Sequence, residues 1–108
     1  MVDESIVTKV RGYLRSVQDH GLAVRFGVIF GSQVAGRPDR WSDIDVLVVS
    51  PLFDGRRNRQ DVDLLWRLAA RADSRIEPIP CGVEQWQEDD SSAVIEIARR
   101  EGLLVALA

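Results

Sequence analysis

The sequence contains few of the residues and segments that mark several classes of protein. Its single cysteine, Cys81, excludes an intrachain disulfide and any metal site built from several cysteines. No apolar run is long enough to span a bilayer, and the first ten residues, MVDESIVTKV, carry acids where a secretory signal has a basic region. We therefore expect a cytoplasmic protein without a membrane segment.

Basic residues are not in excess either. The 108 residues include 14 Lys and Arg against 17 Asp and Glu, a net charge of −3, so the sequence gives no strong signal for nucleic-acid binding. An acidic protein can still bind a polyanion such as a nucleotide when metal ions supply positive charge. The length and the apolar fraction of 45% suit one globular domain, residues 1–108.

Hydrophobic spacing predicts helices that alternate with strands. Helices are expected at 3–20, 58–72 and 91–102, with helical turns at 32–35 and 83–87. Strands are expected at 23–30, 43–50 and 75–82, and the apolar tail 103–108 is either a short strand or a docking segment. This order predicts an α/β (α+β) fold: a small mixed β-sheet with helices packed mainly on one side.

Two aspartates stand two residues apart at the start of the apolar strand DIDVLVVS. In a strand, Asp43 and Asp45 point to the same face, about 6.5–7 Å apart along the chain. Both carboxylates can then converge on one or two hard cations such as Mg²⁺, which prefers oxygen ligands and keeps phosphate and water in its shell. The plainer alternative is a solvated acidic pair beside a turn.

A second pair with the same spacing, Asp61 and Asp63, lies in a helical pattern. Residues i and i+2 of a helix face away from each other, so we discard this pair as a metal site.

The residues upstream of Asp43 favour a functional site. A buried strand runs into Gly31 and Ser32, a helical turn follows, and ten residues separate Ser32 from Asp43. Glycine lets the backbone approach a ligand closely, and a helix start offers free N–H groups to phosphate, with the Ser32 hydroxyl as a further donor. A turn glycine and a capping serine are the alternative explanation.

The stretch FGSQVAGRPDRWSDIDVLV, residues 30–48, resembles the signature of the DNA polymerase beta-type nucleotidyltransferase superfamily. That signature is a hydrophobic residue, Gly, then Gly or Ser, a spacer of about a dozen residues, and Asp-x-Asp or Asp-x-Glu. The small size and the form of the motif are most similar to the minimal nucleotidyltransferases that pair with helical HEPN partners. The resemblance implies a nucleotidyltransferase-like fold across nearly the whole chain.

The resemblance also implies an activity. Such enzymes transfer a nucleoside monophosphate from a nucleoside triphosphate to an acceptor hydroxyl and release pyrophosphate. Gly31 and Ser32 would hold the β- and γ-phosphates, while Asp43 and Asp45 would bind two Mg²⁺ ions. We expect AMP transfer from ATP to a hydroxyl on a protein partner, of the helical HEPN type, with the protein acting as the antitoxin of a toxin-antitoxin pair.

The family also uses a third carboxylate on a following strand. An acceptor hydroxyl has a high pKa and needs a metal or a base before it can attack. Glu77 is the one acid inside the strand RIEPIPCG, so we place it ahead of Asp73 and Glu84 as a catalytic and metal-binding residue with a raised pKa. A solvent-facing strand residue is the alternative, and the prolines after Glu77 depart from the family pattern.

Two arginines lie in the loop beside the expected phosphate site. Arg37 and Arg40 are candidate nucleotide-binding residues because a guanidinium pairs with phosphate through two hydrogen bonds, although a loop arginine is more often solvated. His20 suits the C-terminal end of a helix, which favours a capping role over catalysis.

Two other functions stay open. A small-molecule nucleotidyltransferase, such as the antibiotic-modifying members, would need a partner chain or self-association to complete its acceptor pocket. A catalytically inactive subunit of the same fold would act by binding its partner.

Overall fold

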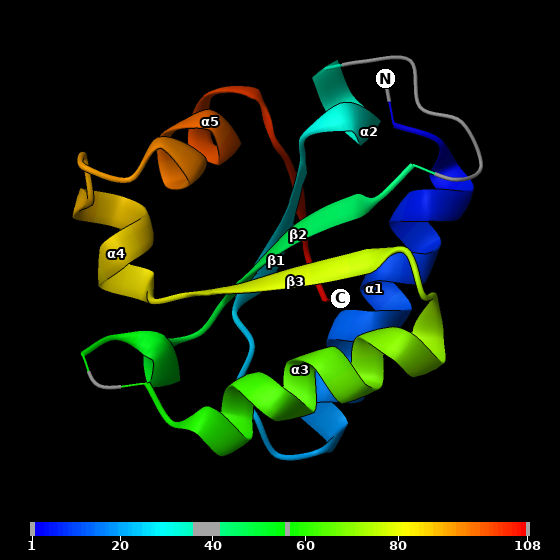
Figure 1. Ribbon diagram of the computed structural model, residues 1–108, viewed down its shortest axis with the longest axis horizontal. Helices are drawn as coiled ribbons and strands as arrows, with labels where there is room; N and C mark the ends of the chain where they lie inside the picture. The colour runs from blue at the N-terminus through cyan, green and yellow to red at the C-terminus, as the bar shows by residue number, and fades with distance from the viewer. Residues whose placement is uncertain (1, 36–41, 56, 108) are drawn as a thin grey trace.

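The computed structural model describes residues 2–35, 42–55 and 57–107. Along the chain the elements are α1 (Glu4–Asp19), β1 (Phe26–Phe30), α2 (Ser32–Ala35), β2 (Ile44–Val49), a 3-10 turn η1 (Pro51–Phe53), α3 (Arg59–Ala72), β3 (Ile76–Cys81), α4 (Val83–Glu88), α5 (Ala93–Glu101) and β4 (Leu103–Val105) (Figure 1). The predicted helices and strands are all present, and the apolar tail supplies a short strand.

The four strands form one mixed sheet in the order β3-β2-β1-β4. β1 pairs antiparallel with both β2 and β4, whereas β2 and β3 are parallel. β2 and β3 are parallel because the long connection through α3 returns the chain to the end of the sheet at which β2 began. The predicted α/β class and mixed sheet are confirmed.

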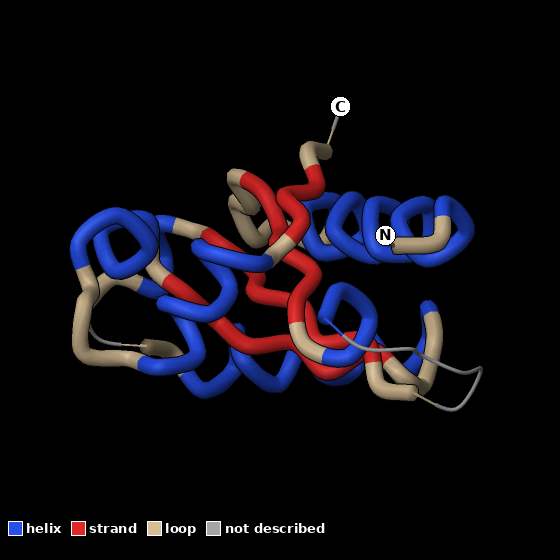
Figure 2. Tube along the Cα trace, turned by 90° about the horizontal axis from the view of Figure 1, so that it is seen from above, coloured by secondary structure: helices blue, strands red, loops and turns tan. Residues whose placement is uncertain are grey.

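Helices cover both faces of the sheet, and the strands run through the middle of the molecule (Figure 2). The two longest, α1 and α3, pack on one face, as the prediction of helices mainly on one side requires. α4 and α5 form a smaller layer on the other face, over side chains that include Val28, Leu47 and Val49. Among the described residues, no helix is long and apolar enough to cross a membrane.

The buried face of α1 and one hydrogen bond to α3 hold the larger helical layer together. Its buried residues follow helical spacing: Ile6, Val10, Tyr13, Leu14 and Val17. The buried Tyr13 hydroxyl donates a hydrogen bond of 2.9 Å to the backbone oxygen of Leu65 on α3. This bond satisfies the phenol inside the core and ties α1 to α3.

Strand β3 lies at an edge of the sheet, and its two prolines have a definite place in the ladder. Ile44 N–H donates to the Arg75 oxygen and Ser50 N–H to the Cys81 oxygen, so the odd-numbered residues of β3 bond to β2. Pro78 and Pro80 therefore occupy positions whose N–H would point outward, where the missing donor costs no ladder bond.

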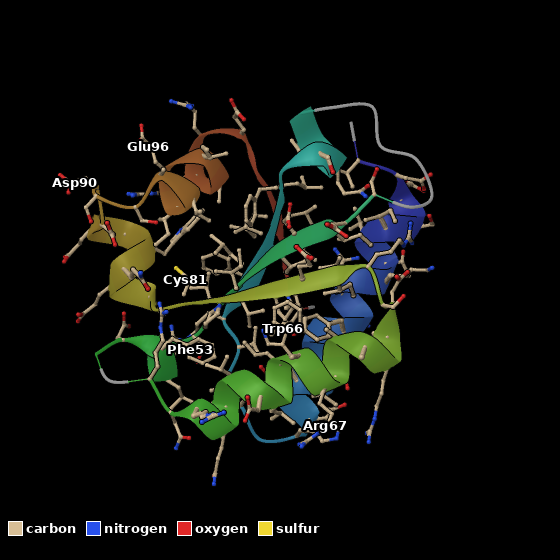
Figure 3. All side chains as sticks on the ribbon, in the orientation of Figure 1. Phe53, Trp66, Arg67, Cys81, Asp90 and Glu96 are labelled. Atoms are coloured by element: carbon tan, nitrogen blue, oxygen red, sulfur yellow. The ribbon has the colours of Figure 1, made fainter. Side chains whose placement is uncertain are left out.

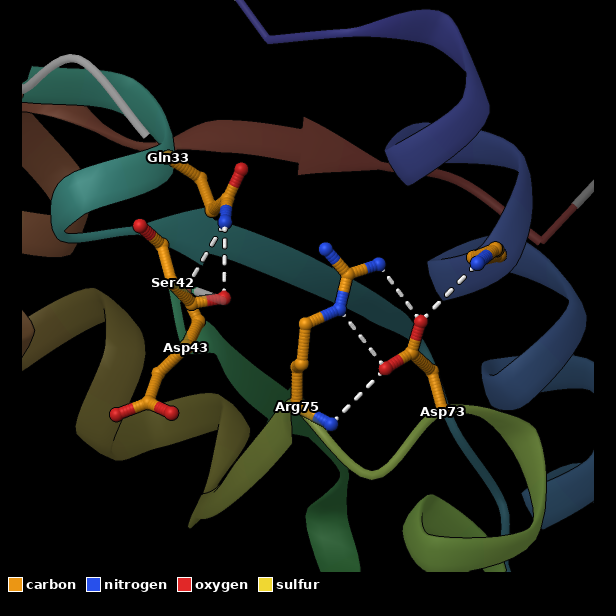
Figure 4. Close-up of polar contacts among 6 residues, drawn as sticks. Gln33, Ser42, Asp43, Asp73 and Arg75 are labelled. Atoms are coloured by element: carbon orange, nitrogen blue, oxygen red, sulfur yellow. Dashed lines mark hydrogen bonds and ion pairs between the residues drawn. The ribbon is translucent and has the colours of Figure 1, made fainter. Parts of the chain in front are cut away.

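Asp73 links three elements at the end of α3 (Figure 4). Its carboxylate accepts hydrogen bonds from the Arg75 side chain at 2.8 and 3.0 Å and from the Lys9 ammonium of α1 at 3.1 Å. The Arg75 hydrogen bonds, helped by Lys9, hold the pKa of Asp73 well below its usual value of 3.8. Asp73 thus has a structural role, and it is not available as the third carboxylate of a site.

We expect Asp73→Asn to lower the free energy of unfolding by about 1–2 kcal/mol at neutral pH, because it removes charged hydrogen bonds from a nearly buried side chain. A lowered pKa gives stabilisation that is present above the ordinary pKa and is lost as the pH falls below it. The difference between the two proteins should therefore shrink between about pH 5 and pH 2 in urea unfolding. Asp63→Asn, at an exposed position of α3, is the matched control and should change stability little; an equal loss there would contradict the assignment.

Candidate active site

The three predicted carboxylates gather at one end of the sheet. Asp45 lies on β2 directly opposite Glu77 on β3 and opposite Phe30 at the end of β1. Ile44 is completely buried on the α1–α3 face, so the strand alternation turns Asp43 and Asp45 to the other face. Asp43 is exposed, and Asp45 and Glu77 are partly buried, so the group can be reached from outside.

The carboxyl groups of Asp45 and Glu77 lie close enough to affect each other's pKa. Desolvation is the largest effect on Asp45 and raises its pKa. The interaction with the Glu77 side chain lowers the pKa, and the charge of Asp43 raises it. Desolvation also raises the pKa of Glu77, helped by the charges of Asp43 and Asp45. The cluster is therefore short of positive charge, the condition in which a cation binds well.

Gly31 lies directly against the Asp45 carboxylate. It has a φ of +77°, a left-handed conformation that side chains rarely adopt. A Cβ atom at this position would also collide with an oxygen of the Asp45 carboxylate. Glycine was predicted here for a close approach to a ligand, and the structure shows a close approach by the chain's own carboxylate.

Ser32 begins α2 and is exposed beside Gly31. The turn is closed by a 3.0 Å hydrogen bond from Val34 N–H to the Gly31 oxygen. With only four residues, α2 contributes little dipole, so a phosphate contact here would depend on the hydroxyl and nearby N–H groups. This contact remains a prediction.

Sequence reasoning missed Gln33. Its side chain is only 4% exposed, and its Nε2 donates to the backbone oxygens of Asp43 at 3.1 Å and Ser42 at 3.4 Å (Figure 4). The carboxylate of Asp43 points away from this amide. A polar residue in a short predicted turn gives no sign of burial, so only its place beside Ser32 could have drawn attention to it.

The donor chemistry of the cluster fits Mg²⁺, because three carboxylates offer the hard oxygen ligands that this ion prefers. In the described ranges, however, no group of three or more His, Cys, Asp or Glu side chains is arranged so that it could hold a metal ion as it stands. A bound cation would offset the charges of Asp43 and Asp45, which add to desolvation in raising the pKa of Glu77.

The remaining candidates lie elsewhere. Arg37 and Arg40 fall outside the described residues. Asp61 and Asp63 are on α3, as predicted for a pair that does not bind metal. Glu84 is in the first turn of α4, which follows the end of β3 opposite to Glu77.

The α4–α5 layer carries its own polar features. Cys81, completely buried beside α4, has a thiol whose pKa burial raises to about 11, so it is a core residue (Figure 3). Asp90 and Glu96 point away from the sheet and line an open surface hollow together with Arg99 and Arg100. None of the three clustered carboxylates lines this hollow.

Comparisons with known proteins agree with this architecture. The sequence model of the nucleotidyltransferase domain matches residues 10–88, which contain β1, β2 and β3. A candidate nucleotidyltransferase from Sulfolobus solfataricus, solved at 1.40 Å, has a TM-score of 0.60 at 17% identity, covering 93% of this chain and 78% of that one. A toxin-antitoxin structure with AMP-PNP has a TM-score of 0.59 at 18% identity, covering 88% and 71%.

Among curated proteins, none matches the chain significantly. The structural likenesses establish the shared fold, and the family match covers most of the chain. The predicted superfamily is thereby confirmed: the chain belongs to the nucleotidyltransferase domain family of transferases.

Proposed function

We propose that the protein transfers AMP from ATP to a hydroxyl group of a protein partner. The observation that carries this proposal is the meeting of Asp43, Asp45 and Glu77 at the end of β1, beside Gly31 and Ser32. Asp43, Asp45 and Glu77 would hold two Mg²⁺ ions, which would supply Lewis-acid stabilisation of the triphosphate and of the departing pyrophosphate.

The chain's own residues account for the other parts of the reaction. The Ser32 hydroxyl would donate to the phosphates. The acceptor oxygen would form a bond to the α-phosphorus while the bond from that phosphorus to pyrophosphate breaks. Glu77 would take the acceptor proton, since a carboxylate with a raised pKa is the better base.

A protein acceptor agrees with the exposure of the site. Asp43 is exposed and Glu77 is partly so, which leaves the cluster open to a partner. The toxin-antitoxin structure with AMP-PNP supports a partner and a nucleotide substrate for a protein of this fold. We propose a helical HEPN-type toxin as the acceptor and an antitoxin role for this chain.

The test is a labelling experiment with Mg²⁺ and a candidate helical partner. ATP labelled at the α-phosphate should label the partner and raise its intact mass by one adenylyl group, whereas ATP labelled at the γ-phosphate should not. Transfer of the γ-label would contradict the proposal, because it would mean phosphoryl transfer. Labelling of an aminoglycoside in place of the protein would establish the small-molecule alternative.

One observation favours a second function, that of a catalytically inactive binding subunit. Among the described residues, no group of three or more His, Cys, Asp or Glu side chains is arranged so that it could hold a metal ion. If this function is correct, the folded protein will bind its partner, and no label will be transferred at any Mg²⁺ concentration.

A further inference from the structure

We infer that Gln33 is a positioning residue that fixes the direction of the Asp43 carboxylate relative to Asp45 and Ser32. The inference rests on the proposed function, since it assigns Gln33 to the same site. It adds a residue that acts through Asp43 and has no contact of its own with substrate.

Asp43 needs such support because it lies at the margin of both strand ladders. The pairing of β1 with β2 ends at Phe30 and Asp45, and the pairing of β2 with β3 begins at Ile44 and Ile76. Asp45 is therefore held by a strand on each side, whereas Asp43 precedes the first pair of either ladder.

The Gln33 amide supplies a fixed point at this margin. Its Nε2 donates to the backbone oxygens of two consecutive residues, Ser42 and Asp43, from a side chain that is almost completely buried. Burial limits the rotamers open to Gln33, so these two bonds hold the peptide at a set place against α2. Because Ser32 precedes Gln33 on α2, the same contact fixes the Ser32 turn relative to Asp43.

The expected consequence is a change in metal affinity. Groups that orient a metal ligand through a hydrogen bond, without touching the metal, typically contribute about 10–100-fold to metal affinity or activity. Gln33→Met keeps a side chain of similar length and removes the donor, so it should leave the fold in place while freeing the peptide that carries Asp43. Gln33→Asn, which retains an amide one methylene too short, should give the same loss if Gln33→Met fails to fold.

Titration of Mg²⁺ alone, and of Mg²⁺ with AMP-PNP, by calorimetry tests this inference. Gln33→Met should weaken Mg²⁺ binding by about 10–100-fold, whereas Gln18→Met, on the exposed surface of α1, should bind as the wild type does. In an Asp43→Asn background, Gln33→Met should have little further effect, because the residue acts through Asp43. Equal losses in both backgrounds, or unchanged affinity in a folded Gln33→Met protein, would overturn the inference.

A readout without metal separates this inference from the proposed function. In the backbone NMR spectrum of the metal-free protein, Gln33→Met should shift the signals of Ser32 and Asp43 and leave those of Asp61 and Asp63 unchanged. If the wild type binds no Mg²⁺, the proposed function fails, but the NMR comparison still decides the role of Gln33. Unchanged Ser32 and Asp43 signals would show that Gln33 does not position them.

Discussion

Changing Asp43 and Asp45 together to asparagine is expected to abolish nucleotidyl transfer, with a loss of more than about 10³-fold, because even one positioned group that stabilises transition-state charge contributes about 10²–10³. Asparagine keeps the shape of each side chain and removes both charges that would attract Mg²⁺. Calorimetry with ATP and Mg²⁺ should show much weaker binding, and α-labelled ATP should label no partner.

The double variant should remain folded, because it removes carboxylates whose repulsion and desolvation raise the pKa of Asp45 and Glu77. Asp61→Asn with Asp63→Asn is the matched control, since it makes the same chemical change on α3. The control should bind ATP and Mg²⁺ normally. Unchanged nucleotide affinity in the Asp43 and Asp45 variant, or a loss confined to the control, would place the site elsewhere.

The second large effect is expected from Glu77→Gln, which should remove transfer while leaving most nucleotide binding in place. In the proposed reaction Asp43 and Asp45 would still hold the nucleotide-bound metal, whereas the acceptor would lose its base and one ligand of the metal beside it. General-base help alone is typically worth about 10²–10⁴-fold. Single-turnover transfer and calorimetry on the same samples measure the two quantities separately.

Melting temperatures of the metal-free protein, measured over a range of pH, check that the pKa of Glu77 is raised. The pKa of Glu77 is raised, so the folded chain holds this proton more tightly than the unfolded chain does. The resulting stabilisation is complete below the ordinary pKa of 4.5 and is lost as the pH rises through the raised pKa. Glu77→Gln should therefore melt at a higher temperature than the wild type near about pH 8 and at a similar temperature near about pH 4.

Near-normal transfer by Glu77→Gln would rule out its role as base and ligand. A melting temperature that is lower than that of the wild type at every pH would show instead that Glu77 is structural. Those two outcomes are distinct, because the first concerns the reaction and the second concerns the fold.

The sequence was sufficient for the parts of the site that depend on local pattern. Period-two alternation placed Asp43 and Asp45 on one face opposite the buried Ile44, and helical period separated Asp61 from Asp63. The sharp turn at Gly31 also followed from residue type, although its contact with Asp45 did not. Local spacing determines which way a side chain points from its own element.

The contacts between different strands and helices could not be predicted from local spacing. Glu77 meets Asp45 only because β3 is parallel to β2 in a particular register, and a shift of one residue would turn Glu77 to the opposite face. The α4–α5 layer and the burial of Gln33 likewise depend on packing between segments that are distant in sequence. Such features arise from tertiary contacts, which a single sequence does not display.

The outward prolines of β3 limit how this molecule can recognise other chains. The edge residues 76, 78 and 80 offer an approaching chain no amide donor, because Ile76 N–H already bonds to the Asp73 oxygen and the other two residues are Pro78 and Pro80. These three positions offer only carbonyl acceptors to an extended segment, which disfavours its addition along this edge as a fifth strand. The strand that presents Glu77 is thus poorly suited to β-pairing, and a protein acceptor of the proposed kind would be selected through side-chain contacts rather than through this edge.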